Sequence, residues 1–194
     1  MLLMDGLEIL DRMVSAVEKV RERLLRATAA LEEAKIDYAV VGGNAVFLWV
    51  EAFEEGGERN TPNVDLLIDR ADLASAVVAL TAAGFTAVAD SPDLFLDGPD
   101  GSPRTRLRLI FAGEKVREAD LLPNPNCQET VRLKAFAVLP LAALVQTKIV
   151  AYRIIDRVHL RDLIDNGLID ASWTKRYPPE FAERLQALID NPNG

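Results

Sequence analysis

The stretch Tyr38-Ala-Val-Val-Gly-Gly-Asn-Ala45 predicts a strand that passes through two glycines directly into a helix. The helix is expected to continue to Phe53, with Asn44 as its N-cap. Glycines let the backbone approach a ligand closely, and the free amides of a helix N-terminus favour an anion. A Gly-Gly pair after a buried strand is more often a plain turn. By itself, this stretch is therefore only a weak indication of a phosphate site.

A second stretch, Arg59-Asn-Thr-Pro-Asn-Val-Asp-Leu-Leu-Ile68, predicts another strand beginning at Asn63. Asn63 and Asp65 are two positions apart, so on a strand they share one face at a spacing of about 6.6 Å. Two oxygen ligands placed in this way can hold Mg²⁺ beside a triphosphate. The alternative interpretation is a pair of polar residues where a strand begins.

The rest of the chain predicts an α/β protein in the broad α+β sense, with a mixed sheet flanked by helices. We expect residues 1–139 to form a core that includes a long N-terminal helix, and residues 140–194 to form a helical part packed on it, together making one structural unit. Helices are expected at 5–35, Ala71–Ala83, Leu141–Asp165 and from Pro178, and further strands at Phe85–Ala89, Leu94–Leu96, Thr105–Phe111 and Arg132–Leu139.

Composition narrows the class of protein. The 194 residues include 22 basic and 30 acidic side chains, giving a net charge of −8, which argues against broad binding to nucleic acid. The N-terminus lacks the basic segment of a signal peptide, and Gly84 interrupts the longest uncharged stretch, so no membrane span is expected. The single cysteine, Cys127, favours a reducing, cytoplasmic location. A nucleophilic role for Cys127 would need a nearby base, and the single histidine is distant in sequence.

Together, the two stretches resemble the nucleotidyltransferase superfamily, in particular its minimal nucleotidyltransferases and the nucleotidyltransferase toxins of abortive-infection systems. Val40–Ala45 is similar to the family's strand, Gly-Gly-Ser turn and helix. Arg59–Asp65 is similar to its Arg-x-Thr-x-Asp-aliphatic-Asp motif. Leu139–Lys148 and Asp156–Leu163 resemble the helix that follows the sheet, so the resemblance covers roughly residues 30–170.

The resemblance implies transfer of a nucleoside monophosphate from a nucleoside triphosphate (NTP) to a hydroxyl acceptor, with Mg²⁺ as cofactor. It places the metal and the chemistry at Asp65 and Asn63, with a further position on the strand that carries Arg108. It also implies a set of residues that bind the nucleotide or its phosphates: Gly42, Gly43, Asn44, Arg59, Thr61 and Lys148.

Three of these positions depart from the family pattern. Asn63 stands where the family has its first metal-binding aspartate, and a neutral amide supplies no charge to Mg²⁺. Asn44 stands where the family often has a serine, which is a mild change because Asn can still cap the helix and its amide can still meet a phosphate. Arg108 stands where a third aspartate is usual, and an arginine cannot accept a proton or bind a metal. We therefore expect weak or absent Mg²⁺ binding and weakened or lost transfer, unless Asp93 or Asp97 supplies the missing carboxylate.

The long C-terminal helix carries cations that could bind phosphates or form a solvated face. Arg153, Arg157 and Arg161 recur every four residues on one predicted face, and a second stripe runs from Lys148 to His159. Three functions stay open: a working transferase, a nucleotide-binding or regulatory module that has lost catalysis, and a partner-binding protein such as an antitoxin-like component. The last would use the apolar stripe Met13–Leu31 of the first helix.

Overall fold

The computed structural model describes residues 6–53 and 61–191, and the side chains from residue 14 onward within them. A seven-stranded mixed sheet runs through the middle of the molecule in the order β3-β4-β5-β2-β1-β7-β6. The central strand β2 pairs antiparallel with β1 and parallel with β5, and β1 pairs parallel with β7. The strands are β1 (Tyr38–Val41), β2 (Val64–Ile68), β3 (Thr86–Val88), β4 (Ser91–Leu96), β5 (Leu107–Phe111), β6 (Val131–Leu133) and β7 (Phe136–Val138).

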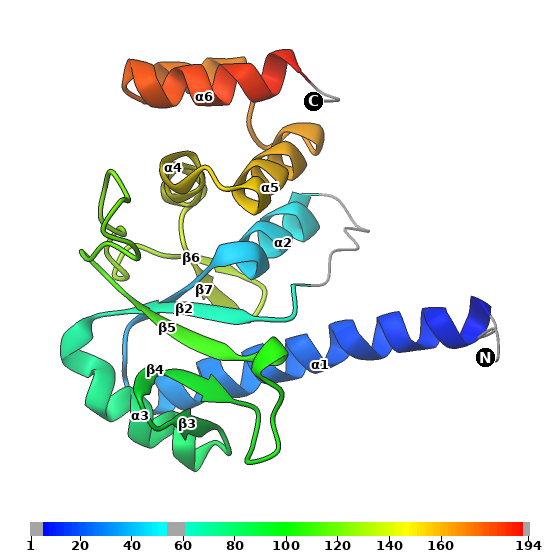
Figure 1. The fold of residues 1–194 in the computed structure, drawn as a ribbon, viewed down its shortest axis with the longest axis vertical. Helices are drawn as coiled ribbons and strands as arrows, with labels where there is room; N and C mark the ends of the chain where they lie inside the picture. The colour runs from blue at the N-terminus through cyan, green and yellow to red at the C-terminus, as the bar shows by residue number, and fades with distance from the viewer. Residues whose placement is uncertain (1–5, 54–60, 192–194) are drawn as a thin grey trace.

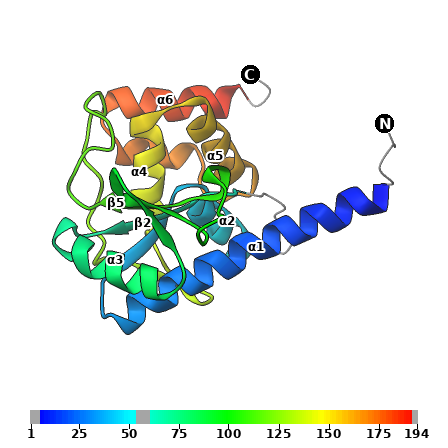
Figure 2. The same ribbon diagram turned by 60° about the horizontal axis from the view of Figure 1, so that its bottom comes forward.

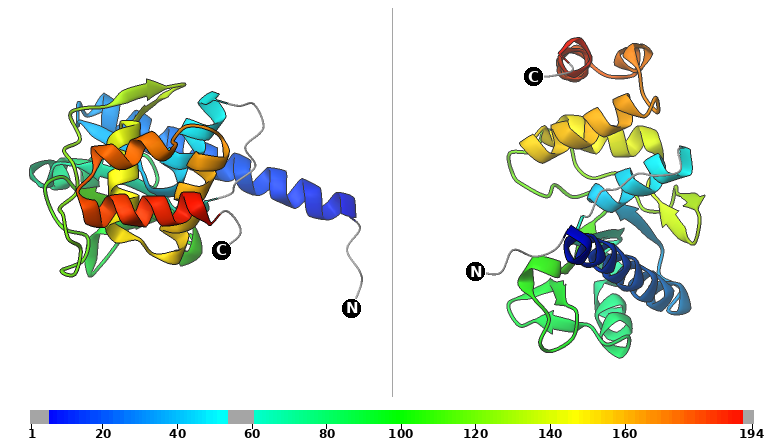
Figure 3. Two further views of the ribbon diagram at one scale, coloured as in Figure 1. Left: turned by 90° about the horizontal axis from the view of Figure 1, so that it is seen from above. Right: turned by 90° about the vertical axis from the view of Figure 1, so that its right-hand side faces the viewer.

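Helices cover both faces of this sheet (Figure 1). One face carries α1 (Gly6–Glu33) and α3 (Leu73–Ala82). The other carries α2 (Gly42–Phe53), with α4 (Leu141–Ala151), α5 (Ile154–Asp165) and α6 (Pro179–Asp190) stacked beyond it (Figure 3). All four residues of β1 are buried, as expected for a strand covered on both sides. The predicted mixed α+β class, with a long first helix and a helical C-terminal part, is confirmed.

The long helix α1 is docked at one end only (Figure 2). Its C-terminal turns bury Leu24, Ala27 and Leu31 in the main core, whereas Val14 is 62% exposed on the half that projects away from the body. At 1.5 Å per residue, the 28 residues of α1 span about 42 Å. None of the helices in the described residues is both long and apolar enough to cross a bilayer.

The single long helix predicted over Leu141–Asp165 is wrong. The helix α4 ends at Ala151, and Tyr152 takes a left-handed backbone conformation with φ of +44°. The helix α5 then starts afresh at Ile154, where Asp156 accepts hydrogen bonds from the backbone N–H and from the guanidinium of the N-cap residue Arg153. Because of this break, the stripe predicted from Lys148 to His159 does not exist as a continuous helical face. The other predicted stripe lies beyond the break, with Arg153 as the N-cap of α5 and Arg157 and Arg161 within that helix.

Smaller local predictions also need correction. The stretch Arg132–Leu139, expected as one strand, is a hairpin of β6 and β7 that turns at Lys134, whose φ is +52°. The helix α2 begins at Gly42, so Asn44 is its third residue and the predicted N-cap role is wrong. Short 3₁₀ helices at Arg70–Asp72, Pro103–Thr105 and Ala171–Arg176 were not anticipated. The proposed division of the chain at residue 140 stays a prediction, although α4 and α5 do pack against α2.

The docking of α1 gives a test of the fold. Replacing the fully buried Leu31 with alanine should lower the free energy of unfolding by about 2–5 kcal/mol, because it leaves a cavity between α1 and the sheet. The matched change Leu25→Ala, at a side chain that is 38% exposed on the same helix, should cost less than about 1 kcal/mol. Urea unfolding followed by circular dichroism measures both. Equal losses would contradict this docking of α1.

Candidate functional site

A cleft of about 420 Å³ lies on the face of the sheet that α2, α4 and α5 cover. Its floor is made by alternate residues of two neighbouring strands. The β2 segment contributes Asn63, Asp65 and Leu67, and the β5 segment contributes Arg106, Arg108 and Ile110. In a strand, residues two positions apart point to the same face. The β2 row therefore presents two polar side chains and one aliphatic side chain to the cleft. The β5 row beside it presents two arginines and one aliphatic side chain.

The register of the sheet sets Arg108 directly beside Asp65. The two residues are partners in the parallel β2–β5 pair, and Arg108 Nε lies 3.7 Å from Asp65 Oδ1. The sequence predicts Arg108 on a strand beside Asp65, and the register places it there. That this is the position of a third carboxylate stays a prediction. The buried Arg108 Nε has no hydrogen-bond partner among the described residues, and the same is true of Asn63 Oδ1. Buried polar atoms without a partner are rare in folded proteins and mark a position where a water, an ion or a ligand can supply the missing contact.

The glycine turn closes one end of the cleft and needs both glycines. Gly42 has a φ of +70°, and a Cβ built on it would lie 2.8 Å from Asp65 Oδ2. A Cβ on Gly43 would lie 2.6 Å from Thr61 Oγ1. The two stretches singled out in the sequence therefore meet in space, with the start of α2 packed against the beginning of β2.

Asn44 belongs to this junction but does not line the cleft. Its side chain is 5% exposed, and its Nδ2 donates a hydrogen bond of 2.7 Å to the backbone oxygen of Asn63. That bond ties α2 to β2, and it leaves only the backbone N–H of Asn44 for the predicted contact with phosphate. Arg59, the remaining member of the predicted motif, lies outside the described residues. Thr61 lines the cleft beside Gly43.

The wall opposite the sheet is formed around a buried carboxylate, Asp156, at the start of α5. Lys148 Nζ lies 3.2 Å from Asp156 Oδ1, and Arg153 Nε lies 2.5 Å from Asp156 Oδ2. The side chain of Asp156 is 1% exposed and that of Lys148 is 6% exposed, whereas Arg153 is 42% exposed toward the cleft opening. Lys148, predicted from the resemblance as a phosphate ligand, therefore lines the cleft while already paired with a protein carboxylate.

The electrostatics of this wall follow from the pairing. Burial alone would raise the pKa of Asp156, but the hydrogen bond from Arg153 and the charge of Lys148 overcome it and hold that pKa below its ordinary value. Burial lowers the pKa of Lys148, and Asp156 works against that shift. Asp156 thus stays ionised and holds the two cations at the cleft.

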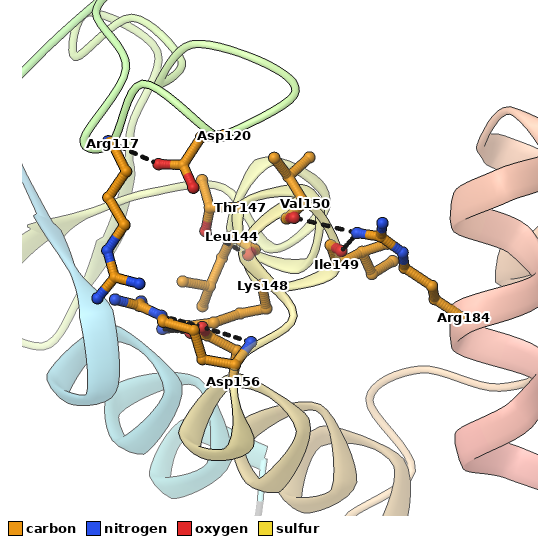
Figure 4. A network of polar contacts seen from close by, with 10 residues as sticks. Arg117, Asp120, Leu144, Thr147, Lys148, Ile149, Val150, Asp156 and Arg184 are labelled. Carbon is orange, nitrogen blue, oxygen red and sulfur yellow. Dashed lines mark hydrogen bonds and ion pairs between the residues drawn. The ribbon is translucent and has the colours of Figure 1, made fainter.

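Two further side chains complete the site from the loop that follows β5. Arg117 extends from this loop toward the Lys148–Asp156 pair, and Asp120 accepts a hydrogen bond of 2.9 Å from the backbone N–H of Arg117 (Figure 4). Both line the cleft. Sequence reasoning missed Arg117 because it lies in a loop, where no periodicity indicates direction. It also missed Arg106, although the alternation with Arg108 was visible.

The alternative carboxylates named from the sequence are not at the site. Asp97 pairs with Arg23, at 3.1 Å, and with Arg26, both on α1. In the β4–β5 pair, Leu94 is the partner of Arg108, so its neighbour Asp93 points to the opposite face. The prediction that Asp93 or Asp97 supplies the missing third carboxylate is therefore wrong. Cys127 does not line the cleft, and burial raises its pKa to about 11, so its thiol is not an activated nucleophile.

The residues of the cleft do not fit the Mg²⁺ ion that the resemblance implies. Asn63 Oδ1 could coordinate a cation, but the amide carries no charge. Asp65 beside it is the charged ligand. Arg108 places a permanent positive charge 3.7 Å from that carboxylate. Within the described residues no three His, Cys, Asp or Glu side chains are grouped to hold a metal. A hard dication with few protein ligands depends on carboxylate charge, which this arrangement largely cancels.

Comparison with solved structures gives distant similarities, among them the following two. The antibiotic-resistance factor ANT(2'')-Ia matches with a TM-score of 0.44 and 13% identity, over 87% of this chain and 81% of that one. JHP933 from Helicobacter pylori matches with a TM-score of 0.42 and 12% identity, over 93% and 91%. Similarity at this level does not establish a shared function. No protein-family model and no curated protein sequence matches the chain.

The buried carboxylate gives a prediction for stability. Asp156→Asn should lower the free energy of unfolding by about 3 kcal/mol at neutral pH, because Lys148 would be left buried without a counter-charge. The control is Asp165→Asn on the same helix, where the carboxylate is 58% exposed and lies 3.8 Å from Arg161. This control should change stability by less than about 0.5 kcal/mol.

The Lys148–Asp156 pair should also make the free energy of unfolding depend on pH in the acidic range. Because the folded-state pKa of Asp156 is lowered, its contribution is complete above the ordinary aspartate pKa and is lost as pH falls through the lowered value. Urea unfolding between neutral and acidic pH should therefore show a smaller acid-induced loss for Asp156→Asn than for wild type. An identical pH profile would mean that the pair contributes nothing through its charge.

Proposed function

We propose that the cleft binds the phosphates of a nucleoside triphosphate or a related polyphosphate ligand, and that nucleotidyl transfer from it is weakened or lost. The observation that carries this proposal is the placement of Arg108 beside Asp65 on the floor of the cleft. That placement keeps a guanidinium suited to phosphate oxygens, at the position where transfer chemistry of the resembled family would require a carboxylate.

Several features of the cleft support an anionic ligand. The amides at the N-terminus of α2 begin at Gly42 and Gly43, which line the cleft and have no side chains to obstruct it. The helix dipole favours negative charge at that end. Arg106, Arg108 and Arg153 surround the same space from two different elements. The cleft is positively lined although the chain as a whole carries a net charge of −8, and this local positive charge favours an anionic ligand.

Binding can be tested with variants of Arg153, the N-cap residue of α5, and of Arg157 within that helix. Calorimetric titration with ATP should give a measurable affinity for wild type, and Arg153→Gln should weaken it about tenfold by removing a charge-assisted contact. Arg157→Gln, one turn further along the same helix and outside the cleft lining, should bind ATP as wild type does. Binding of none of the four NTPs, and no binding of inorganic tripolyphosphate, would refute the proposed function.

Catalysis is tested by transfer of labelled nucleoside monophosphate from each NTP to protein, tRNA and small hydroxyl acceptors. We expect no robust Mg²⁺-dependent transfer by wild type, because the site retains one certain carboxylate ligand. The double variant Asn63→Asp with Arg108→Asp should bind Mn²⁺ or Mg²⁺ more tightly than either single variant. Robust transfer by the unmodified protein, abolished in Asp65→Ala, would show instead that it is a working transferase.

A second candidate function is a non-catalytic module that binds a protein partner. The observation that favours it is the projecting half of α1, where Val14 is 62% exposed and Val17 is 37% exposed. Apolar side chains at helical spacing on an extended arm are typical of helix-mediated association. This candidate predicts that the double variant Val14→Ser with Val17→Ser weakens binding of a protein partner without changing the affinity for ATP. If the protein acts only as a nucleotide-binding module, the double variant should change neither.

A further inference from the structure

We propose that the cleft takes its polyphosphate ligand free of divalent metal, with Arg106 and Arg108 of the β5 row supplying the positive charge, so that Mg²⁺ opposes binding. This inference rests on the proposed function, because it presumes that a polyphosphate enters the cleft. It goes further by stating that the ligand binds without a metal ion. It also predicts that Mg²⁺ weakens ligand binding, whereas nucleotidyl transfer would require Mg²⁺ to strengthen it.

The first argument is the unused hydrogen-bonding capacity of Arg108. Its Nε is buried and has no hydrogen-bond partner among the described residues, and the nearest carboxylate oxygen, at 3.7 Å, is beyond hydrogen-bond distance. The side chain is 33% exposed at the cleft. The guanidinium therefore interacts with Asp65 through charge alone, and its hydrogen-bonding capacity is not taken up by the described residues. Its planar set of donors matches the oxygens of a phosphate group.

The second argument is the balance of charge around the cavity. Its lining contains five cationic side chains, Arg106, Arg108, Arg117, Lys148 and Arg153, and three acidic ones, Asp65, Asp120 and Asp156. Asp156 is committed to Lys148 and Arg153 through the contacts described above. The excess of positive charge is therefore part of the protein and is present before any ion binds.

The third argument is what Mg²⁺ would do in such a cleft. On the ligand, the ion cancels two negative charges and so weakens the attraction to the arginines. In the position implied by the resemblance, near Asp65, the ion would lie close to the fixed charge of Arg108 and be repelled by it. Both effects act in the same direction, so the metal-free ligand should be the preferred form.

The experiment compares ATP binding to the full chain in EDTA with binding in excess Mg²⁺, at an ionic strength equalised with KCl. Wild type should bind ATP at least about threefold more tightly in EDTA. Arg108→Gln should weaken binding in EDTA about tenfold and remove the difference between the two conditions. The matched variant Arg21→Gln, which removes one positive charge from the exposed surface of α1, should behave as wild type.

A second variant tests the sign of the effect at Asp65. Asp65→Asn, which keeps the shape that fits against Gly42, should tighten ATP binding in EDTA because it removes a repulsive charge from the floor of the cleft. At a metal-dependent site the same change would weaken binding in Mg²⁺. Circular dichroism and thermal unfolding of each variant check that the fold is retained.

The outcomes separate this inference from the proposed function. Equal or tighter ATP binding in Mg²⁺ than in EDTA, or weaker binding by Asp65→Asn, would overturn the metal-free inference while leaving a nucleotide site in place. No binding of ATP or tripolyphosphate under either condition would overturn the proposed function itself. Preference for EDTA that is lost in Arg108→Gln and kept in Arg21→Gln would support both.

Discussion

The contact between Gly42 and Asp65 is the constraint on which the site depends. In the antiparallel β1–β2 pair, Val41 is the register partner of Asp65, so the chain must turn away from the sheet directly above that carboxylate. Only a residue without Cβ leaves room for the Asp65 side chain and takes the φ of +70° that starts α2. The sheet register, the direction of α2 and the end of the cleft therefore follow from one close approach.

The opposite wall depends on a different kind of contact, a buried ionic cluster. Burying the charges of Lys148 and Asp156 away from water costs free energy. The attraction between the two charges, together with the further hydrogen bonds that Arg153 donates to the same carboxylate, offsets that cost. The left-handed turn at Tyr152 makes this possible, since it redirects α5 and brings Asp156 back over Lys148. The cleft thus lies between a sheet whose register is set by sterics and a helical wall that is held by charge.

These two walls explain why the cleft is basic in an acidic protein. Acidic groups near it are either committed to cations, as Asp156 is, or placed beside one, as Asp65 is beside Arg108. Carboxylates that could have changed the balance are turned elsewhere, Asp97 toward α1 and Asp93 to the far face of the sheet. The charge of the site is therefore decided by where each side chain points, which the overall charge of the chain does not indicate.

Local sequence by itself determined the strands at the centre of the sheet, the two-glycine turn and the placement of Asn63 and Asp65, because alternation and glycine positions act over a few residues. It also allowed Arg108 to be aligned with Asp65. The tertiary structure alone decided that Asn44 bonds to Asn63, that Lys148 is held by Asp156, and that Arg106 and Arg117 share the cleft. These depend on the break at Tyr152 and on contacts between segments far apart in the chain, where helical spacing within one segment carries no information.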